Sequence, residues 1–238
     1  MTNPNRQRAG QPTGGQFAQS RRPAAGVGLS SLIYTDDGFR KVGSVDELNE
    51  ATVNGEKKIE FSFPDPVIIG QSDKPMRYRL RESANVTVLQ GDATIELTDD
   101  AAAVVGGSIE VDASDRTRVQ AYQYARVLAS GDTQVNVRDN AFVEASGRSM
   151  VRAQDGALVD ALREATVVAQ DNATVSILDH GVVVTAMGKS EVQSFSDVAG
   201  RVIQVGDEVT VDHFDEHDEL APHPHHMVPV PKNPRWET

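Results

Sequence analysis

An eight-residue repeat runs through the middle of this chain, from residue 93 to residue 188. Small or apolar residues occupy alternate places in each octad, and the last two places hold turn-forming residues such as Asp, Asn and Gly. The central apolar place is the most regular, because it is Val in every octad from Val111 to Val183. An earlier unit, made by Ala84, Val86 and Val88, lies one residue out of phase with the others.

The alternation has the period of a β-strand with one buried face. Strands of about five or six residues fit between the turns. One octad is too short to complete a coil, so we pair two octads, or sixteen residues, per coil; three octads per coil, with a triangular section, is the alternative. Amphipathic helices are disfavoured by the regular Val and by the Asp, Asn and Gly turns. The repeat therefore predicts an all-β fold, a narrow β-solenoid (parallel β-helix) of 8-residue repeats.

Such a stack needs covered ends. Each coil buries little by itself, so stability comes from stacking, and an open end exposes a strand edge. The repeat accounts for about six coils, or a column of about 30 Å, and small N- and C-terminal caps are expected on either side. The sequence divides into a disordered basic tail (1–28), an N-terminal α/β cap (29–83), the octapeptide-repeat solenoid (84–188), a C-terminal cap (189–220) and a His/Pro-rich tail (221–238).

The two caps carry local signals of their own. Ser44 and Glu47 form a capping box that predicts a short helix, with Gly55 as its end. Strands are expected at residues 59–63 and 67–69. After the repeat, residues 202–205 and 209–211 predict a hairpin around Gly206.

Charge is distributed unevenly along the chain. The net charge is −12, yet residues 1–24 hold four Arg and no acid, which leaves −16 for the remainder. An acidic body repels nucleic acid, so we expect a protein partner and no direct binding of nucleic acid. There is no Cys and no apolar run long enough for a membrane span, and the N-terminus lacks the apolar core of a signal peptide. These features predict a cytoplasmic protein, or one carried in a phage particle.

Two resemblances follow from these residues. The octads of residues 84–188 resemble the Ala-x-Val-x-Ala-x-(Asp/Gly)-(Asn/Ser) octapeptide-repeat β-solenoid proteins of actinobacteria, other bacteria and their phages. Residues 8–18 (RAGQPTGGQFA) resemble a short N-terminal tag shared by otherwise unrelated actinobacterial and actinophage proteins. The resemblances imply an architecture and a source, and they imply almost nothing about activity.

A histidine group near the C-terminus is the first candidate site. Imidazole and carboxylate groups are good ligands for zinc or nickel, and histidines four residues apart share a helix face. However, the Glu of a His-Glu-x-x-His motif is absent and prolines flank three of the histidines, so we expect no cofactor beyond adventitious divalent metal. The five histidines are His213, His217, His223, His225 and His226.

The outward positions of the octads are the second candidate site. With sixteen residues per coil, one sheet carries an acidic column and the other is partly basic, although charged ladders also arise simply to discourage aggregation. A flat apolar patch on one sheet could pair two chains into a homo-oligomer, unless the N-terminal cap shades it. The acidic column is Glu96, Asp112, Leu128, Glu144, Asp160 and Ser176; the basic face has Arg118, Arg138, Arg152 and Tyr122; the apolar patch is Phe142, Leu158, Leu162 and Leu178.

No catalytic motif accompanies the repeat. Calcium-binding Gly-Gly-x-Gly-x-Asp turns, a phosphate-binding Gly loop and a nucleophile elbow are all absent from the sequence. The sequence therefore predicts a non-enzymatic structural or protein-interaction module, associated with a phage or mobile element. The alternative is an acidic DNA mimic that inhibits a nucleic-acid-handling enzyme, and a metal-dependent role of the histidines is a third hypothesis.

Overall fold

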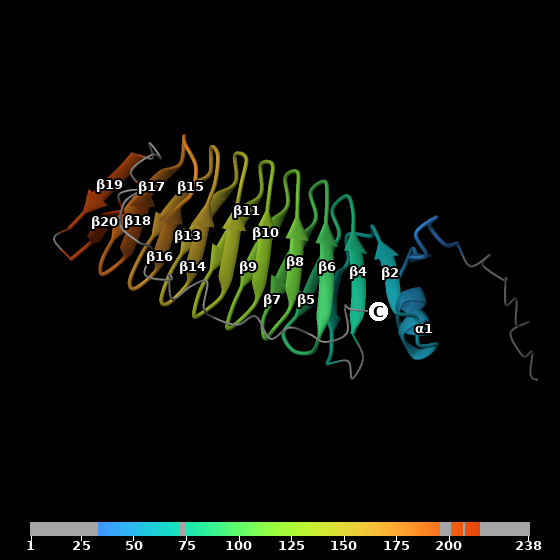
Figure 1. The fold of residues 1–238 in the computed structure, drawn as a ribbon. Helices are drawn as coiled ribbons and strands as arrows, with labels where there is room; N and C mark the ends of the chain where they lie inside the picture. The colour runs from blue at the N-terminus through green and yellow to red at the C-terminus, as the bar shows by residue number, and fades with distance from the viewer. Residues whose placement is uncertain (1–32, 72–74, 196–200, 207, 215–238) are drawn as a thin grey trace, which may run out of the picture. The chain divides into compact units, whose positions relative to one another are not determined.

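The computed structural model describes residues 33–71, 75–195, 201–206 and 208–214. The unit that begins at Tyr34 is a β-solenoid (Figure 1) with two sheets of eleven and nine strands, and from β2 onward successive strands alternate between the two sheets. Every strand pairing between the named strands is parallel, and the two sheets together make about ten turns. The prediction of an all-β solenoid is confirmed, and the stack is longer than the six coils expected from the octads.

The strands follow the alternating pattern of buried residues. The 11-stranded sheet contains, in spatial order, β1 (Arg40–Val42), β2 (Lys58–Phe61), β4 (Met76–Leu80), β6 (Ala93–Leu97), β8 (Glu110–Ala113), β10 (Arg126–Ala129), β12 (Phe142–Ala145), β14 (Leu158–Ala161), β16 (Thr174–Ile177), β18 (Glu191–Phe195) and β20 (Thr210–Phe214). The 9-stranded sheet contains β3 (Pro66–Ile69), β5 (Asn85–Val88), β7 (Ala102–Val105), β9 (Arg118–Ala121), β11 (Gln134–Val137), β13 (Met150–Ala153), β15 (Thr166–Ala169), β17 (Val183–Met187) and β19 (Arg201–Val205).

The register of these sheets is regular through the repeat. From β6 to β16, residues that pair on adjacent strands of one sheet are sixteen apart, as in Val111 with Val127 and Val127 with Val143. The inward Val and Ala side chains of both sheets are almost completely buried. Because these side chains are small, the two sheets share one narrow apolar core along the solenoid.

The turns place one residue of each octad in the left-handed conformation. Asp99, Asp115 and Asp139 have φ of 62°, 62° and 58°, and Gly131 and Gly147 occupy the equivalent place further along. The Asp115 carboxylate also accepts a hydrogen bond from the backbone N–H of Asp99 in the preceding coil, at 3.3 Å. Asp therefore stabilises these turns in two ways: it tolerates a positive φ, and its carboxylate accepts a hydrogen bond from the backbone of the adjacent coil.

The repeat shifts phase once, in its last octad. The turn after β16 is one residue longer than the other turns within the octads that begin at residue 93, so Thr166 pairs with Val183, seventeen residues on. Val182, Val184 and Ala186 are consequently the buried residues of β17. The expectation that the octads continue in one phase to residue 188, with Val183 facing inward, is therefore wrong.

The N-terminal end is covered by the predicted helix. Helix α1 (Val45–Val53) begins after Ser44, whose hydroxyl accepts a hydrogen bond from the Glu47 N–H at 3.3 Å. Leu48 and Ala51 are buried, and the helix packs against β1 at the edge of the 11-stranded sheet. The strands expected at residues 59–63 and 67–69 are β2 and β3, and they extend the two sheets of the solenoid.

The C-terminal strands do not form the predicted hairpin. β19 pairs in parallel with β17, and β20 pairs in parallel with β18. The two strands therefore belong to different sheets and add a further turn to the solenoid. A chain turn between two strands of a solenoid has the same kind of sequence as a hairpin turn, because in both cases the chain reverses direction. In the solenoid the two strands then face each other across the core and do not pair, which is why the residues around Gly206 were mistaken for a hairpin.

Candidate functional site

The outward face of the 11-stranded sheet is acidic from β6 to β18. The register brings the predicted column together, because Glu96 pairs with Asp112, and Glu144 pairs with Asp160 two strands further along. Leu128 connects the two acidic pairs, and Ser176 follows Asp160. From β6 to β18, the outward strand positions hold six carboxylates and a single guanidinium: Glu96, Glu110, Asp112, Glu144, Asp160, Glu191 and Arg126.

Apolar side chains lie in the middle of this acidic face. Leu128 is 42% exposed, and its neighbours Phe142 and Leu158 are half-buried and pair with each other. Arg126 lies over the Phe142 ring at 5.3 Å from the centroid. Leu162 and Leu178 of the predicted apolar patch follow at the ends of β14 and β16, and Leu178 is also exposed. The face therefore combines an apolar centre with carboxylates on both sides.

The outward face of the 9-stranded sheet has the opposite character. Its strand positions from β3 to β19 contain no Asp or Glu, and they contain Arg118, Arg152 and Arg201. Arg118 pairs with Gln134, and Arg152 pairs with Asn136, so amides surround the guanidinium groups. The two faces of one solenoid thus differ in sign of charge.

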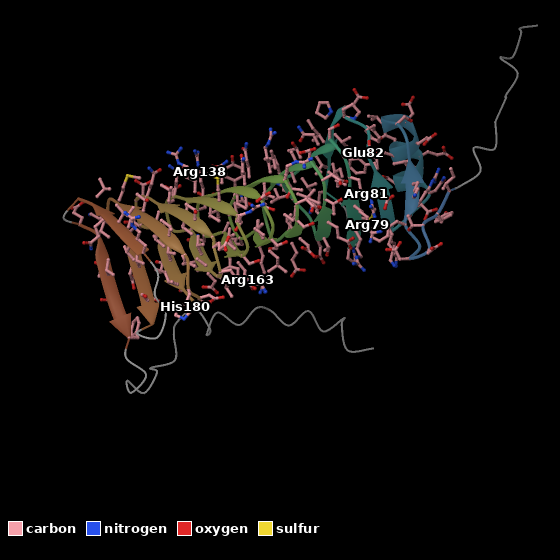
Figure 2. The ribbon with its side chains drawn as sticks, turned by 90° about the horizontal axis from the view of Figure 1, so that it is seen from above. Arg79, Arg81, Glu82, Arg138, Arg163 and His180 are labelled. Carbon is pink, nitrogen blue, oxygen red and sulfur yellow. The ribbon has the colours of Figure 1, made fainter. Side chains whose placement is uncertain are left out.

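Hydrogen bonds hold the basic face in place without neutralising it. Arg138 Nε donates to Gln154 Oε1 at 2.8 Å, and Arg152 Nη2 donates to Gln170 Oε1 at 2.9 Å. Tyr122 lies one coil before Arg138, and its hydroxyl donates to Gln120 Oε1 at 3.1 Å. Figure 2 shows Arg138 on the side of the solenoid opposite to Arg163 and His180. Neutral partners keep these positive charges available to a ligand.

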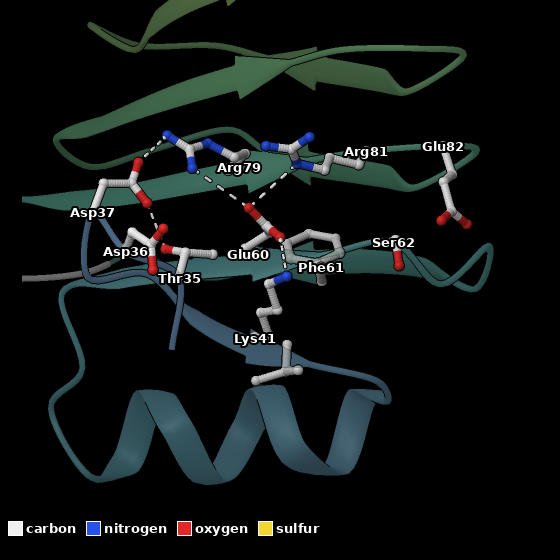
Figure 3. A pocket seen from close by; sticks show the side chains of 11 residues that line it. Thr35, Asp36, Asp37, Lys41, Glu60, Phe61, Ser62, Arg79, Arg81 and Glu82 are labelled. Carbon is white, nitrogen blue, oxygen red and sulfur yellow. Dashed lines mark hydrogen bonds and ion pairs between the residues drawn. The ribbon is translucent and has the colours of Figure 1, made fainter. Parts of the chain in front are cut away.

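An ion-pair cluster at the N-terminal end was not predicted. The Glu60 carboxylate is buried and lies 3.7 Å from Lys41 Nζ, 3.5 Å from Arg79 Nη1 and 3.3 Å from Arg81 Nε (Figure 3). These side chains line a hollow of about 570 Å³, which also includes Asp37 and Thr35.

Arg79 connects this cluster to the acidic column. It contacts Asp37 and Glu96, each at 2.7 Å, and it stacks on Phe39 at 4.0 Å from the ring centroid. The hydrogen bonds from Arg79 and from Thr35 hold the pKa of Asp37 well below its usual range. Because each cation here has a carboxylate partner, the hollow is a structural ion-pair network. Glu96, which also contacts a second arginine, contributes less free charge to the acidic face than Asp112 or Glu144 does.

The histidine candidates lie mostly outside the described residues. His213 belongs to the backbone of β20, while His217, His223, His225 and His226 fall beyond residue 214. Within the described ranges, no three His, Asp or Glu side chains converge on a common metal position. In that part of the chain, too, helix α1 is far too short to cross a bilayer.

Comparison with protein families, with curated proteins and with solved structures finds no match to this chain. The function is therefore argued from the two faces of the solenoid itself.

Proposed function

We propose that this chain is a non-enzymatic β-solenoid that binds a protein partner through the outward face of its 11-stranded sheet. The observation that carries the proposal is the segregation of charge between the two sheets. Charges that served only to keep strands apart could be of either sign on either sheet. Here the 11-stranded sheet carries six outward carboxylates and one cation from β6 to β18, whereas the strands of the other sheet carry no carboxylate. Segregated charge steers a partner of opposite sign to one face.

The apolar centre of the acidic face supports a protein partner. Specific protein interfaces combine a desolvated, partly apolar centre with a polar rim. Leu128, Phe142 and Leu158 would supply the centre, with Glu110 and Asp112 on one side and Glu191 on the other. The partner that fits this face has exposed apolar residues bordered by Lys or Arg.

Charge density argues against mimicry of DNA. The span from β6 to β18 covers six strand spacings, or about 29 Å at about 4.8 Å each. A net charge of −5 over that distance is roughly one charge per 6 Å, while duplex DNA has one charge per about 1.7 Å. Leu128 also interrupts the acidic column at its middle. DNA mimicry is therefore the alternative hypothesis that the experiment below distinguishes from binding of a basic protein partner.

Association with a phage or mobile element is part of the same proposal, and it rests on the resemblance of the octads and of the N-terminal tag. This association determines which cell lysates the experiment uses. Bait would be incubated with lysates of actinobacteria with and without an induced phage, and captured proteins would be quantified by mass spectrometry.

The test compares two variants of equal net charge. The first neutralises the acidic face by Glu110→Gln, Asp112→Asn and Glu144→Gln, three exposed carboxylates. The second adds three charges to the opposite face by Gln120→Lys, Gln134→Lys and Asn136→Lys. We expect the first variant to lose at least tenfold of the captured partner and the second to retain it. Equal capture by all three proteins refutes the proposed face.

A third variant separates the protein partner from the DNA mimic. Leu128→Ala removes apolar contact area and leaves every charge in place. A protein interface centred on Leu128 weakens severalfold in this variant. A DNA mimic would be unaffected by it, and its target would instead be displaced by added duplex DNA.

A further inference from the structure

The two ends of the solenoid differ in how their core is covered. At the N-terminal end, Leu48 and Ala51 of α1 and Val42 of β1 are buried and close the apolar core. At the C-terminal end, β19 and β20 are the last strands of their sheets. Their inward residues Val202 and Val211 are only half-buried, although Val184 and Val192, one coil earlier, are completely buried. No described residue covers the core at this end.

Among the described strands, β19 and β20 are also the edges of their sheets at this end. Arg201 N–H donates to Val182 O at 2.9 Å, so alternate residues of β19 bond to β17 and the N–H groups of Val202 and Gln204 point to the free edge. On the outer side of the same strand, Ile203 is 38% and Val205 is 51% exposed. An apolar edge strand of this kind pairs readily with another chain.

The segment that follows β20 is poorly suited by its sequence to cover the end. The residues that follow β20 begin with Asp215, Glu216, Asp218 and Glu219, which are charged. Beyond them, prolines at 222, 224, 229, 231 and 234 lack the N–H that a sheet edge requires. A second copy has what is needed, because it offers the same β19 edge, where Ile203 and Val205 are exposed and alternate N–H groups point away from β17.

We propose that two copies of this chain associate end to end through β19 and β20. β19 and β20 lie in different sheets and run in opposite directions. A two-fold axis perpendicular to the solenoid axis therefore brings the two edge strands of one copy against the two edge strands of the other. The strands that meet are antiparallel. A C2 arrangement of this kind is self-complementary and closes at two copies. With α1 over the opposite end, the assembly stops at a dimer.

The size of the contact predicts a concentration-dependent dimer. An end formed by two strands of about five residues, in sheets about 10 Å apart, covers roughly 400 Å² per copy including side chains. The total of roughly 800 Å² is below the 1,200–2,000 Å² of stable complexes. Since each chain carries −12, the dimer should tighten as salt rises, whereas binding of a basic partner to the acidic face should weaken.

Sedimentation velocity of the full chain over about 5–500 μM tests the proposal. We expect the weight-average mass to rise toward twice the monomer mass with the unmodified chain. Gln204→Pro removes an N–H group at the free edge of β19 without breaking the hydrogen bonds to β17. Ile203→Lys places a charge on the same edge strand. Both should raise the dissociation constant at least tenfold. Ile68→Lys, the same change on β3 at the other end of the 9-stranded sheet, should leave it within twofold.

A distance measurement excludes other modes of pairing. The chain has no cysteine, so Ile203→Cys and Ile68→Cys each give one labelling site. In the end-to-end dimer, pulsed electron paramagnetic resonance should give a distance below about 20 Å between labels at 203 and about 80 Å between labels at 68, since β3 and β19 are eight strand spacings apart.

A chain that stays monomeric to 500 μM overturns the proposal, and so does a dimer that both β19 variants leave intact. Thermal unfolding of each variant checks that Gln204→Pro and Ile203→Lys are folded. If one of them is not, the other variant and the two label distances still decide the outcome.

Discussion

Replacing Ser149 by alanine should stabilise this protein. Ala101, Thr117, Thr133, Ser149 and Ala165 occupy the same inward place on consecutive coils, and all five are completely buried. Thr133 donates to the Ser130 carbonyl at 2.6 Å and lies 3.2 Å from the Thr117 hydroxyl. The Ser149 hydroxyl has no hydrogen-bond partner among the described residues, so its burial is uncompensated.

The magnitude follows from the cost of an unpaired hydroxyl. Burying such a group without a partner costs about 1–3 kcal/mol. The oxygen that alanine lacks leaves a void of roughly 10–15 Å³, which costs about 0.3 kcal/mol. Ser149→Ala should therefore raise the free energy of unfolding by about 1 kcal/mol, or the Tm by about 2–4 °C for a chain of this size.

A neighbouring substitution supplies the control. Thr133→Ala removes a satisfied hydrogen bond and a buried methyl group, so it should lower the free energy of unfolding by about 2 kcal/mol. Ser190 lies directly before β18 of the 11-stranded sheet, is buried, and has no hydrogen-bond partner for its hydroxyl in the described part of the chain, so it should respond as Ser149 does. Thermal unfolding followed by circular dichroism measures all three changes. A Tm that falls by 1 °C or more in Ser149→Ala would refute the reasoning, because the hydroxyl would then have a partner.

Two further predictions concern a buried phenol and a tight turn. Burial raises the pKa of Tyr78 to about 12, so its contribution to stability is complete below about pH 10 and is lost as the pH rises toward 12. The free energy of unfolding should fall over that interval by up to about 3 kcal/mol, and the urea midpoint should fall with it. Tyr78→Phe should remove this fall, and an identical pH profile of the variant would count against the prediction. Gly147→Ala should lower the free energy of unfolding by about 1–2 kcal/mol, because Gly147 has φ +66° and a Cβ there would lie 3.0 Å from Gly131 N. An unchanged urea midpoint would contradict the strain.

The repeat predicts the solenoid because strand alternation and turn chemistry agree in every octad. The phase shift in the last octad was missed because residues 182–184 are all Val, so the phase continued from the earlier octads still places a Val, Val183, at the central inward position. What decides is the longer turn, where Gly181 has φ +83° and a Cβ would lie 3.1 Å from the Arg163 carbonyl oxygen. Turn length depends on the fit to the preceding coil, which an octad count does not contain.

The candidate surfaces were predictable to different degrees. The acidic column follows from counting sixteen residues, because register alone makes Glu144 and Asp160 neighbours. The cluster around Glu60 depends on segments outside the repeat, and no spacing rule brings Asp37 next to Arg79. Its one signal in the sequence is the alternation of Arg77, Arg79 and Arg81, which places three cations on one face of a strand.

The sixteen-residue register sets the unit in which this molecule can change length. Loss or gain of one whole coil leaves every later residue on its original sheet. Loss of a single octad before residue 142 would leave the strand pattern intact, but it would move every later strand to the opposite sheet. Glu144 and Asp160 would then lie on the arginine-bearing face, and Arg152 would lie on the acidic face. Two octads are thus the smallest step by which the solenoid can lengthen or shorten and still keep its two faces distinct.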